Sequence, residues 1–257
     1  MNQIREFTTK DTPADPSNRA IEIFRSQKWV RVSFGGEIIA DSKNVILLRQ
    51  KGRSPVYYFP KEEVRQEFLK ETGRLAKFPA LGKASLLTVQ VGRRIAENAA
   101  WLIAEPSPEA PEIEGYIAFK WAEMDAWYEE NEQVFVHPRD PYVRIDTIQS
   151  SRKVRVELEG EIIAETDRPV LLFETGLPAR FYIPKEDLRL DLLEPSDTHT
   201  ACPYKGVASY YSIKLGDRRI KDVAWYYPYP HAEVGKIQDL VAFYPGKVDA
   251  IYVDGIK

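Results

Sequence analysis

The residues best suited to chemistry lie in one stretch, residues 198–211. It holds the only cysteine, Cys202, together with His199 and with Lys205 among tyrosines. A thiol becomes a nucleophilic thiolate near neutral pH beside a base or a cation, so these three are candidate catalytic residues of a hydrolase- or transferase-like enzyme. Residues three apart on an extended strand point to opposite faces, so His199 and Cys202 converge only if the chain turns at Pro203. A buried core cysteine is the alternative.

A binding pocket fits the composition of this region better than catalysis. Ligand sites are mostly apolar concavities with a few placed polar groups. Aromatic rings supply apolar walls here, and a lysine supplies a charge for a carboxylate, carbonyl or phosphate. We therefore predict a small-molecule site with the ligand-binding residues Tyr204, Lys205, Tyr210, Tyr211, Trp225 and Asp249. A single cysteine excludes paired Cys-x-x-Cys zinc motifs, and we expect neither a metal nor another cofactor.

The chain contains a long internal repeat. The pentapeptide Gly-Glu-Ile-Ile-Ala at 36–40 recurs 124 residues later at 160–164, and Ala100-Trp101 recurs as Ala224-Trp225 at the same offset. A period this long indicates two duplicated domains rather than a solenoid. The predicted organisation is a flexible N-terminal arm at 1–20, a first repeat domain at 21–130, a linker at 131–151 and a second repeat domain at 152–257.

Each repeat is predicted to be mostly strand. Val154, Val156 and Leu158 alternate with charged residues, which is typical of a half-buried strand. Apolar segments bounded by Gly, Pro, Asp or Thr predict further strands at 170–173, 181–183, 208–215, 222–227, 240–244 and 250–253. A helical turn is expected after Pro184, and a longer helix at 61–72 with Gly73 as its stop. The pattern predicts an all-β protein of antiparallel strands with minor helix.

The two repeats differ in polarity at the candidate site. The equivalent positions, second repeat first, are His199 and Leu75, Cys202 and Phe78, Lys205 and Leu81, Tyr210 and Leu86, and Tyr211 and Leu87. Polar groups are thus present in the second repeat and replaced in the first, which favours a site in the second repeat and a degenerate one in the first. Alternatively, the apolar side chains of the first repeat form a scaffold or homo-oligomer surface. Trp225 also suits a core position, since Trp101 matches it, and Asp249 a turn cap, since Asp125 matches it.

Charge and hydropathy exclude several classes of partner. The formal charge is −3, with 36 basic and 39 acidic residues and no basic run, so we expect no nucleic-acid partner. The first residues are polar, and no apolar run approaches the length of a membrane span, so we expect no membrane partner. We predict a soluble, cytoplasmic protein.

Several motifs resemble a known family. These are Cys-Pro-Tyr-Lys-Gly-Val-Ala-Ser-Tyr at 202–210, Ala-Trp-Tyr-Tyr-Pro at 224–228, Val-Asp-Ala-Ile-Tyr-Val-Asp-Gly at 248–255 and His-Pro-Arg-Asp-Pro-Tyr at 137–142. Together they resemble tandem two-domain members of the domain of unknown function 427, also labelled nucleotidyltransferase domain 9. The resemblance implies two β-tent-like domains, similar to Mss4-like domains. Zinc-binding relatives of that fold carry paired cysteines, which this chain lacks. The sequence also has no Gly-rich phosphate cradle to support the nucleotidyltransferase label.

Overall fold

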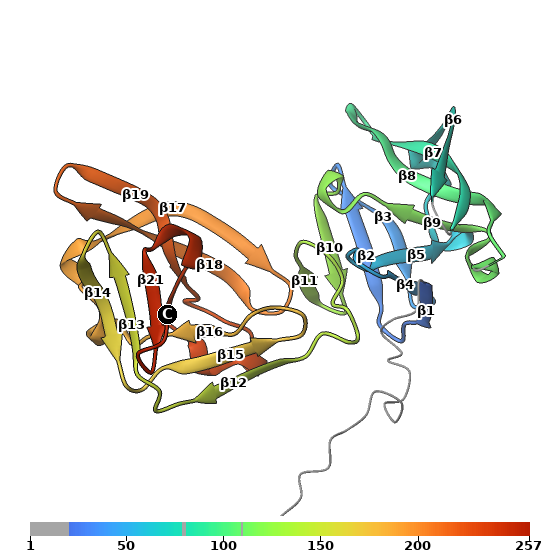
Figure 1. Cartoon of the computed structure of the whole chain (residues 1–257). Coiled ribbons are helices and arrows are strands. Elements are labelled where there is room, and N and C mark those ends of the chain that lie inside the picture. Colours follow the sequence, from blue (N-terminus) through green and yellow to red (C-terminus); the bar gives the residue numbers. More distant parts are fainter. Residues whose placement is uncertain (1–20, 79–80, 109) are drawn as a thin grey trace, which may run out of the picture. The chain divides into compact units, whose positions relative to one another are not determined.

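The computed structural model describes residues 21–78, 81–108 and 110–257 (Figure 1). The chain divides into two compact units, one ending at Asp140 and the other running Pro141–Lys257. The predicted arm at 1–20 lies outside the described residues. Antiparallel strands make up most of the described part of each unit, joined by turns and short 3₁₀ helices, which confirms the all-β prediction.

The strands of the first unit form two antiparallel sheets. The larger sheet has the order β1 (Ile21–Arg25), β4 (Ile46–Gln50), β5 (Val56–Pro60), β9 (Tyr116–Phe119), β8 (Arg94–Pro106), β7 (Gly82–Val91) and β6 (Leu69–Phe78). The smaller sheet has the order β11 (Glu132–Val134), β10 (Ala126–Glu129), β2 (Val30–Phe34) and β3 (Glu37–Ser42). Side chains alternate across β5: Tyr57 and Phe59 lie in the core shared with the smaller sheet, and Tyr58 lies in a second core on the other face.

Each described strand of the first unit except β11 has an equivalent in the second unit, next to the equivalent neighbours. One ladder contains β12 (Ile145–Gln149), β15 (Val170–Glu174) and β16 (Arg180–Tyr182), and another contains β17 (Leu193–Cys202), β18 (Gly206–Leu215), β19 (Arg218–Tyr226) and β20 (Val241–Phe243). Ile183 and Val241 exchange two backbone hydrogen bonds of 2.8 Å, which join these ladders into one large sheet. The smaller sheet contains β14 (Glu161–Thr166), β13 (Val154–Leu158) and β21 (Ala250–Val253).

The large sheet of the second unit again has a core on each face. Phe181 and Ile183 pack into the core shared with the smaller sheet, and Tyr182 packs into the core of the opposite face. We call the first the interlayer core and the second the outer core. The two faces of the large sheet therefore contact two separate hydrophobic cores.

Short 3₁₀ helices connect the strands. They are η2 (Lys61–Glu63), η3 (Gln66–Phe68), η4 (Pro111–Ile113) and η5 (Trp121–Glu123) in the first unit, and η6 (Lys185–Asp187), η7 (Leu190–Leu192), η8 (Ala232–Ile237) and η9 (Pro245–Lys247) in the second. The prediction of a helix at 61–72 is wrong: within that range only η2 and η3 are helical. Leu69–Glu71 instead pair with Leu87–Val89 in the ladder of β6 and β7. Gly73, at φ +69°, lies where the register of β6 shifts, so its positive φ serves a bulge rather than a helix end.

The duplication extends to individual strands and backbone bonds. β1 and β12 are equivalent at the offset of 124 residues, as are β10 and β21. The amide of Asp125 donates to the carbonyl of Ser33 at 2.9 Å, and the amide of Asp249 donates to the carbonyl of Glu157 at the same distance. The segment predicted as a linker, 131–151, contains β11 and β12, so part of it belongs to the sheets.

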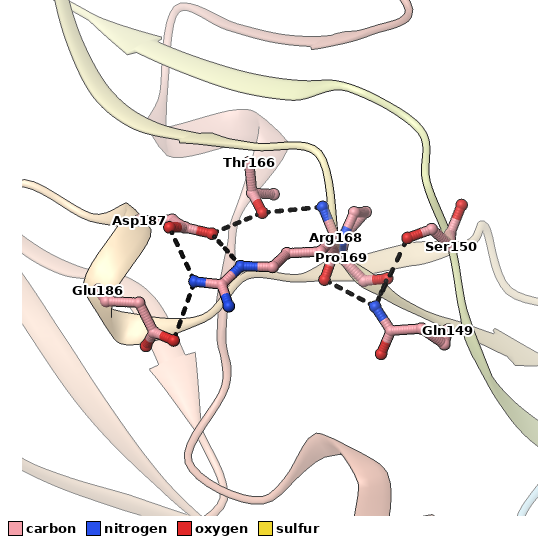
Figure 2. Close-up of polar contacts among 7 residues, drawn as sticks. All are labelled: Gln149, Ser150, Thr166, Arg168, Pro169, Glu186 and Asp187. Carbon is pink, nitrogen blue, oxygen red and sulfur yellow. Dashed lines mark hydrogen bonds and ion pairs between the residues drawn. The ribbon is translucent and has the colours of Figure 1, made fainter.

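Figure 2 shows a polar network that belongs to this duplicated framework. Asp187 accepts hydrogen bonds from the Thr166 hydroxyl at 2.7 Å and from Arg168 Nε at 3.2 Å, and the Thr166 hydroxyl also accepts the Arg168 amide at 3.1 Å. In the first unit the equivalent residues make equivalent bonds: the Asn44 amide donates to the Ser42 hydroxyl at 2.9 Å, and Asn44 Nδ2 donates to Glu63 at 2.6 Å. The network ties the turn between β14 and β15 to η6. Its presence in both repeats indicates a structural role.

Candidate functional site

A cleft of about 200 Å³ opens on the outer-core face of the large sheet in the second unit. Its walls come from β15, β16, β17, β18 and β19 and from the turn after β17. The lining residues are Leu172, Glu174, Leu177, Pro178, Arg180, Tyr182, Thr200, Lys205, Tyr210, Trp225, Tyr227 and Tyr244. Residues two apart on one strand, such as Leu172 and Glu174, reach it together because a strand alternates its side chains between faces.

An ion pair with little exposure lies in the wall of the cleft. Lys205 Nζ is 2.5 Å from Glu174 Oε2, and the two side chains are 12% and 11% exposed. The turn that carries Lys205 requires a glycine after it. Gly206 has φ +101°, and a Cβ at this position would lie 3.0 Å from the Tyr229 carbonyl oxygen. Taking two charges out of water costs free energy that their attraction seldom more than offsets, so the pair is weak evidence for stability.

Hydroxyl groups line the rest of the cleft. The Tyr210 hydroxyl lies 2.7 Å from the Thr200 hydroxyl and 3.4 Å from the Tyr244 hydroxyl. Burial is the main cause that raises the pKa of Tyr227 and Tyr244 above the ordinary 10.0, so both phenols stay protonated at neutral pH. Tyr227 is 5% exposed, and its hydroxyl makes no hydrogen bond with a side chain that the structure describes. Its O–H is therefore available to a molecule in the cleft.

Arg180 is the second cation of the cleft. It is half-buried, and its guanidinium makes no hydrogen bond or ion pair with any described residue. The charged residues of the lining are Arg180, Lys205 and Glu174, so the cleft carries one positive charge in excess. A guanidinium held in a half-buried site without a carboxylate partner is an anchor for an anion.

Three of the predicted ligand-binding residues meet in this cleft: Lys205, Tyr210 and Trp225. Trp225 is also a core residue, because its ring nitrogen donates to the Tyr182 hydroxyl at 3.2 Å, as that of Trp101 donates to the Tyr58 hydroxyl at 3.2 Å. The tryptophan is thus part of the duplicated framework and forms the base of the site.

The other predicted ligand-binding residues lie elsewhere. Tyr204 lies in the turn between β17 and β18 and does not line the cleft. Tyr211 projects from the opposite face of β18 and stacks on Tyr226, with ring centroids 4.8 Å apart. Asp249 accepts the backbone amide of Glu159 at 2.5 Å, as Asp125 accepts that of Gly35 at 2.7 Å, so it caps a turn.

His199 and Cys202, two of the candidate catalytic residues, both lie on β17. The ring of His199 is hydrogen-bonded through Nδ1 to the Ser209 hydroxyl at 3.2 Å in an exposed position. Cys202 is half-buried at the end of β17, opposite Gly206, and no hydrogen bond joins it to His199 in the described part of the chain. Within the described ranges, no group of three or more His, Cys, Asp or Glu residues could hold a metal ion.

Comparison with known families adds to this picture. The family model described as a domain of unknown function (DUF427) matches residues 22–130 and 146–254, one match on each repeat. The chain belongs to the DUF427 family. It is therefore a tandem member with two DUF427 domains. No curated protein matches the chain. Among the described residues, no helix is long and apolar enough to cross a membrane.

The first DUF427 domain fills the equivalent of the cleft with its own side chains. Leu81, at the position of Lys205, is 5% exposed and lies in the core. Phe78, at the position of Cys202, stacks on Trp101 with ring centroids 5.5 Å apart. Leu86 packs against the same core, and Leu87 lies in the core on the other face of the sheet. These four apolar residues pack against the cores of their own domain, and the scaffold and homo-oligomer alternatives stay predictions.

Sequence reasoning missed the acidic and guanidinium groups of the cleft. Glu174 and Arg180 are equivalent to Gln50 and Val56, and Thr200 is equivalent to Ala76. They show the same replacement of polar by uncharged or apolar side chains that singled out Lys205. Comparing the two DUF427 domains at every position, rather than around the cysteine alone, would have found them.

Proposed function

We propose that the second DUF427 domain binds a small carboxylate-bearing molecule in the cleft. The observation that carries this proposal is Arg180, a half-buried guanidinium with no partner among the described residues, beside the Lys205–Glu174 pair. The excess positive charge favours an anion, and low exposure strengthens the attraction because the local dielectric constant is below that of water.

The remaining walls suit the apolar part of such a ligand. Tyr244 packs on Trp225 with ring centroids 4.3 Å apart, which gives a continuous aromatic wall. The Tyr227 hydroxyl is positioned to donate a hydrogen bond. A volume of about 200 Å³ is small compared with the roughly 300–1,000 Å³ of sites for drug-sized molecules, so the ligand is a small acid rather than a nucleotide.

The test is calorimetric titration of the full-length protein with acetate, benzoate, 4-hydroxybenzoate and glycine, with benzamide as the neutral analogue of benzoate. We expect at least one carboxylate to bind and benzamide to bind at least tenfold more weakly. Arg180→Val, which introduces the residue of the first domain at Val56, should weaken carboxylate binding at least tenfold, because it removes the charged donor. Arg144→Ala, at a side chain that is 80% exposed, is the matched control and should leave binding unchanged.

Two results would overturn the proposal. One is equal affinity of Arg180→Val and the unchanged protein for the carboxylate that binds. The other is the absence of a heat signal with all four carboxylates at millimolar concentration. Thermal unfolding of each variant without ligand checks that the domain is folded.

A further inference from the structure

A second cavity lies in the second DUF427 domain, between the large and the small sheet. Its volume is about 330 Å³, and its walls are mainly apolar side chains of β13, β16, β20 and β21. Phe181, Ile183 and Phe243 form part of its lining and belong to the interlayer core. It is thus separated from the carboxylate cleft by the large sheet, and only Pro178 and Arg180, at the start of β16, border both.

In the first domain a tryptophan ring occupies the equivalent space. Trp127, at the position of Ile251, is 2% exposed and stacks on Trp121, with ring centroids 4.3 Å apart and an interplanar angle of 4°. Its ring also lies 6.1 Å from that of Phe59 and 6.4 Å from that of Phe119. Phe59 and Phe119 are equivalent to the cavity-lining Ile183 and Phe243, so the indole of Trp127 stands where the second domain has open volume.

The second domain lacks both indoles. Ile251 replaces Trp127 and Pro245 replaces Trp121, and both replacements line the cavity. Ile251 is half-buried, whereas Trp127 is buried. Removing large rings from a packed interlayer leaves unfilled volume, which lowers stability unless another molecule fills it.

The first domain also shows how such a ring is oriented. The ring N–H of Trp127 donates to the backbone carbonyl of Trp121 at 3.3 Å. Pro245 presents a carbonyl at the equivalent chain position. A ligand with a ring N–H can therefore make the bond that the Trp127 side chain makes in the other repeat.

We propose that the interlayer cavity binds a bicyclic heteroaromatic molecule with a ring N–H, of the indole class. The ligand replaces the missing Trp127 ring between Ile183, Phe243 and Ile251, and its N–H donates to the Pro245 carbonyl. Apolar protein cavities of sufficient size bind small aromatic molecules, since the contact surface of the ring is removed from water. Charged groups border the cavity at Arg180, Asp249 and Lys257, of which Asp249 already accepts the Glu159 amide.

The experiment is titration of the full-length protein with indole, followed by calorimetry and by methyl-group nuclear magnetic resonance. We expect one equivalent of indole to bind, with the largest shifts at methyl groups of Val154, Ile183 and Ile251. Ile251→Trp should weaken indole binding at least tenfold, because the side chain then fills the cavity. Trp127→Ile should raise the stoichiometry from one to two, because it opens the same space in the first domain.

The outcome can be separated from that of the proposed carboxylate site. The double variant Glu174→Gln with Lys205→Leu, which alters only the cleft, should bind indole like the unchanged protein, and Ile251→Trp should still bind the carboxylate. Unchanged indole affinity of a folded Ile251→Trp protein would overturn the inference. Two results with the unchanged protein would overturn it as well. One is that indole shifts only methyl signals of residues that do not line the cavity, and the other is that indole does not bind up to its solubility.

Discussion

At the scale of single residues, the Lys205 and Glu174 side chains in the cleft each stabilise the charge of the other. Lys205 and Glu174 are each accessible to water over about a tenth of their side chains, at 12% and 11%. Neither can be removed alone without leaving an opposite charge in a poorly solvated place. At the same positions the first domain has two uncharged residues, Leu81 and Gln50.

This dependence gives a prediction about stability. Lys205→Leu alone should lower the free energy of unfolding of the second domain by about 2–4 kcal/mol, since it leaves the Glu174 carboxylate without its partner. Adding Glu174→Gln should recover most of that loss. Denaturant unfolding monitored in both variants measures it, and a double variant no more stable than the single one would contradict the account.

Cys202 allows a separate prediction. Because its thiol is half-buried and has no hydrogen bond to His199, it should react with iodoacetamide more slowly than free cysteine at neutral pH. His199→Ala should leave that rate within a factor of about two, the two side chains having no direct bond. A fast, His199-dependent reaction would contradict this prediction and favour the enzyme hypothesis.

Residue types alone identified part of the cleft. Lys205 and Tyr210 were predicted because they replace Leu81 and Leu86 of the first repeat, and Trp225 was predicted for its aromatic ring although Trp101 matches it. Tyr211, predicted by the same comparison, does not line the cleft: it faces the interlayer core and stacks on Tyr226. A sequence offset shows that a position has changed but not the face of the strand on which it lies. Neighbouring residues of a strand point to opposite faces, so Tyr211 lies on the other side of β18 from Tyr210.

At the scale of elements, the strands that alternate were predictable and the exposed edge strand was not. β13 shows the period-two burial that its sequence predicts, and β21 was predicted with its observed bounds. β17 was missed because it lies at the edge of its ladder, contains Pro195 and is mostly not buried, so its sequence carries no apolar alternation. Edge strands are specified by their partner rather than by their own pattern.

The network around Asp187 joins the turn between β14 and β15 to η6, and its contribution to stability depends on pH. The hydrogen bond from Arg168, with a further one from Thr166, lowers the Asp187 pKa below its ordinary 3.8, against the opposing effect of burial. A lowered carboxyl pKa contributes stability above 3.8 that is lost as the pH falls through the lower, folded value. η6 should therefore loosen in acid.

The matching measurement compares thermal unfolding of the unchanged protein and Asp187→Asn between pH 7 and pH 2.5. At pH 7 the variant should be less stable by about 1–2 kcal/mol, the range of a partly exposed hydrogen bond to a charged group. The difference should shrink as the pH falls below 3.8. If the stability difference between the two proteins stays constant over this pH range, the charge of Asp187 does not contribute to stability.

At the scale of the whole molecule, each unit has the parts of an independent domain. The second unit has its own interlayer and outer cores, and its strands pair within the unit in the described ladders. The repeat, the strand-rich composition and the asymmetry between the two domains could all be predicted from the offset. Cavity volumes could not, because they depend on which large rings pack where, as with Trp127 against Ile251.

It follows that residues 141–257 expressed alone should unfold cooperatively on heating and keep the carboxylate affinity of the full chain within a factor of about three. Absence of a cooperative transition in that segment, with one present in the full chain, would mean that the second unit depends on the first for stability.

The most direct test of the central claim, that one of two duplicated sites has kept a cleft for a small acid, observes both domains in one sample. Backbone nuclear magnetic resonance spectra of the full-length protein are followed during titration with the carboxylate that binds best. We predict shifts at Thr200, Lys205 and Tyr227 and none at the equivalent Ala76, Leu81 and Ile103. Shifts of similar size at both sets, or shifts confined to residues outside the cleft, would contradict it.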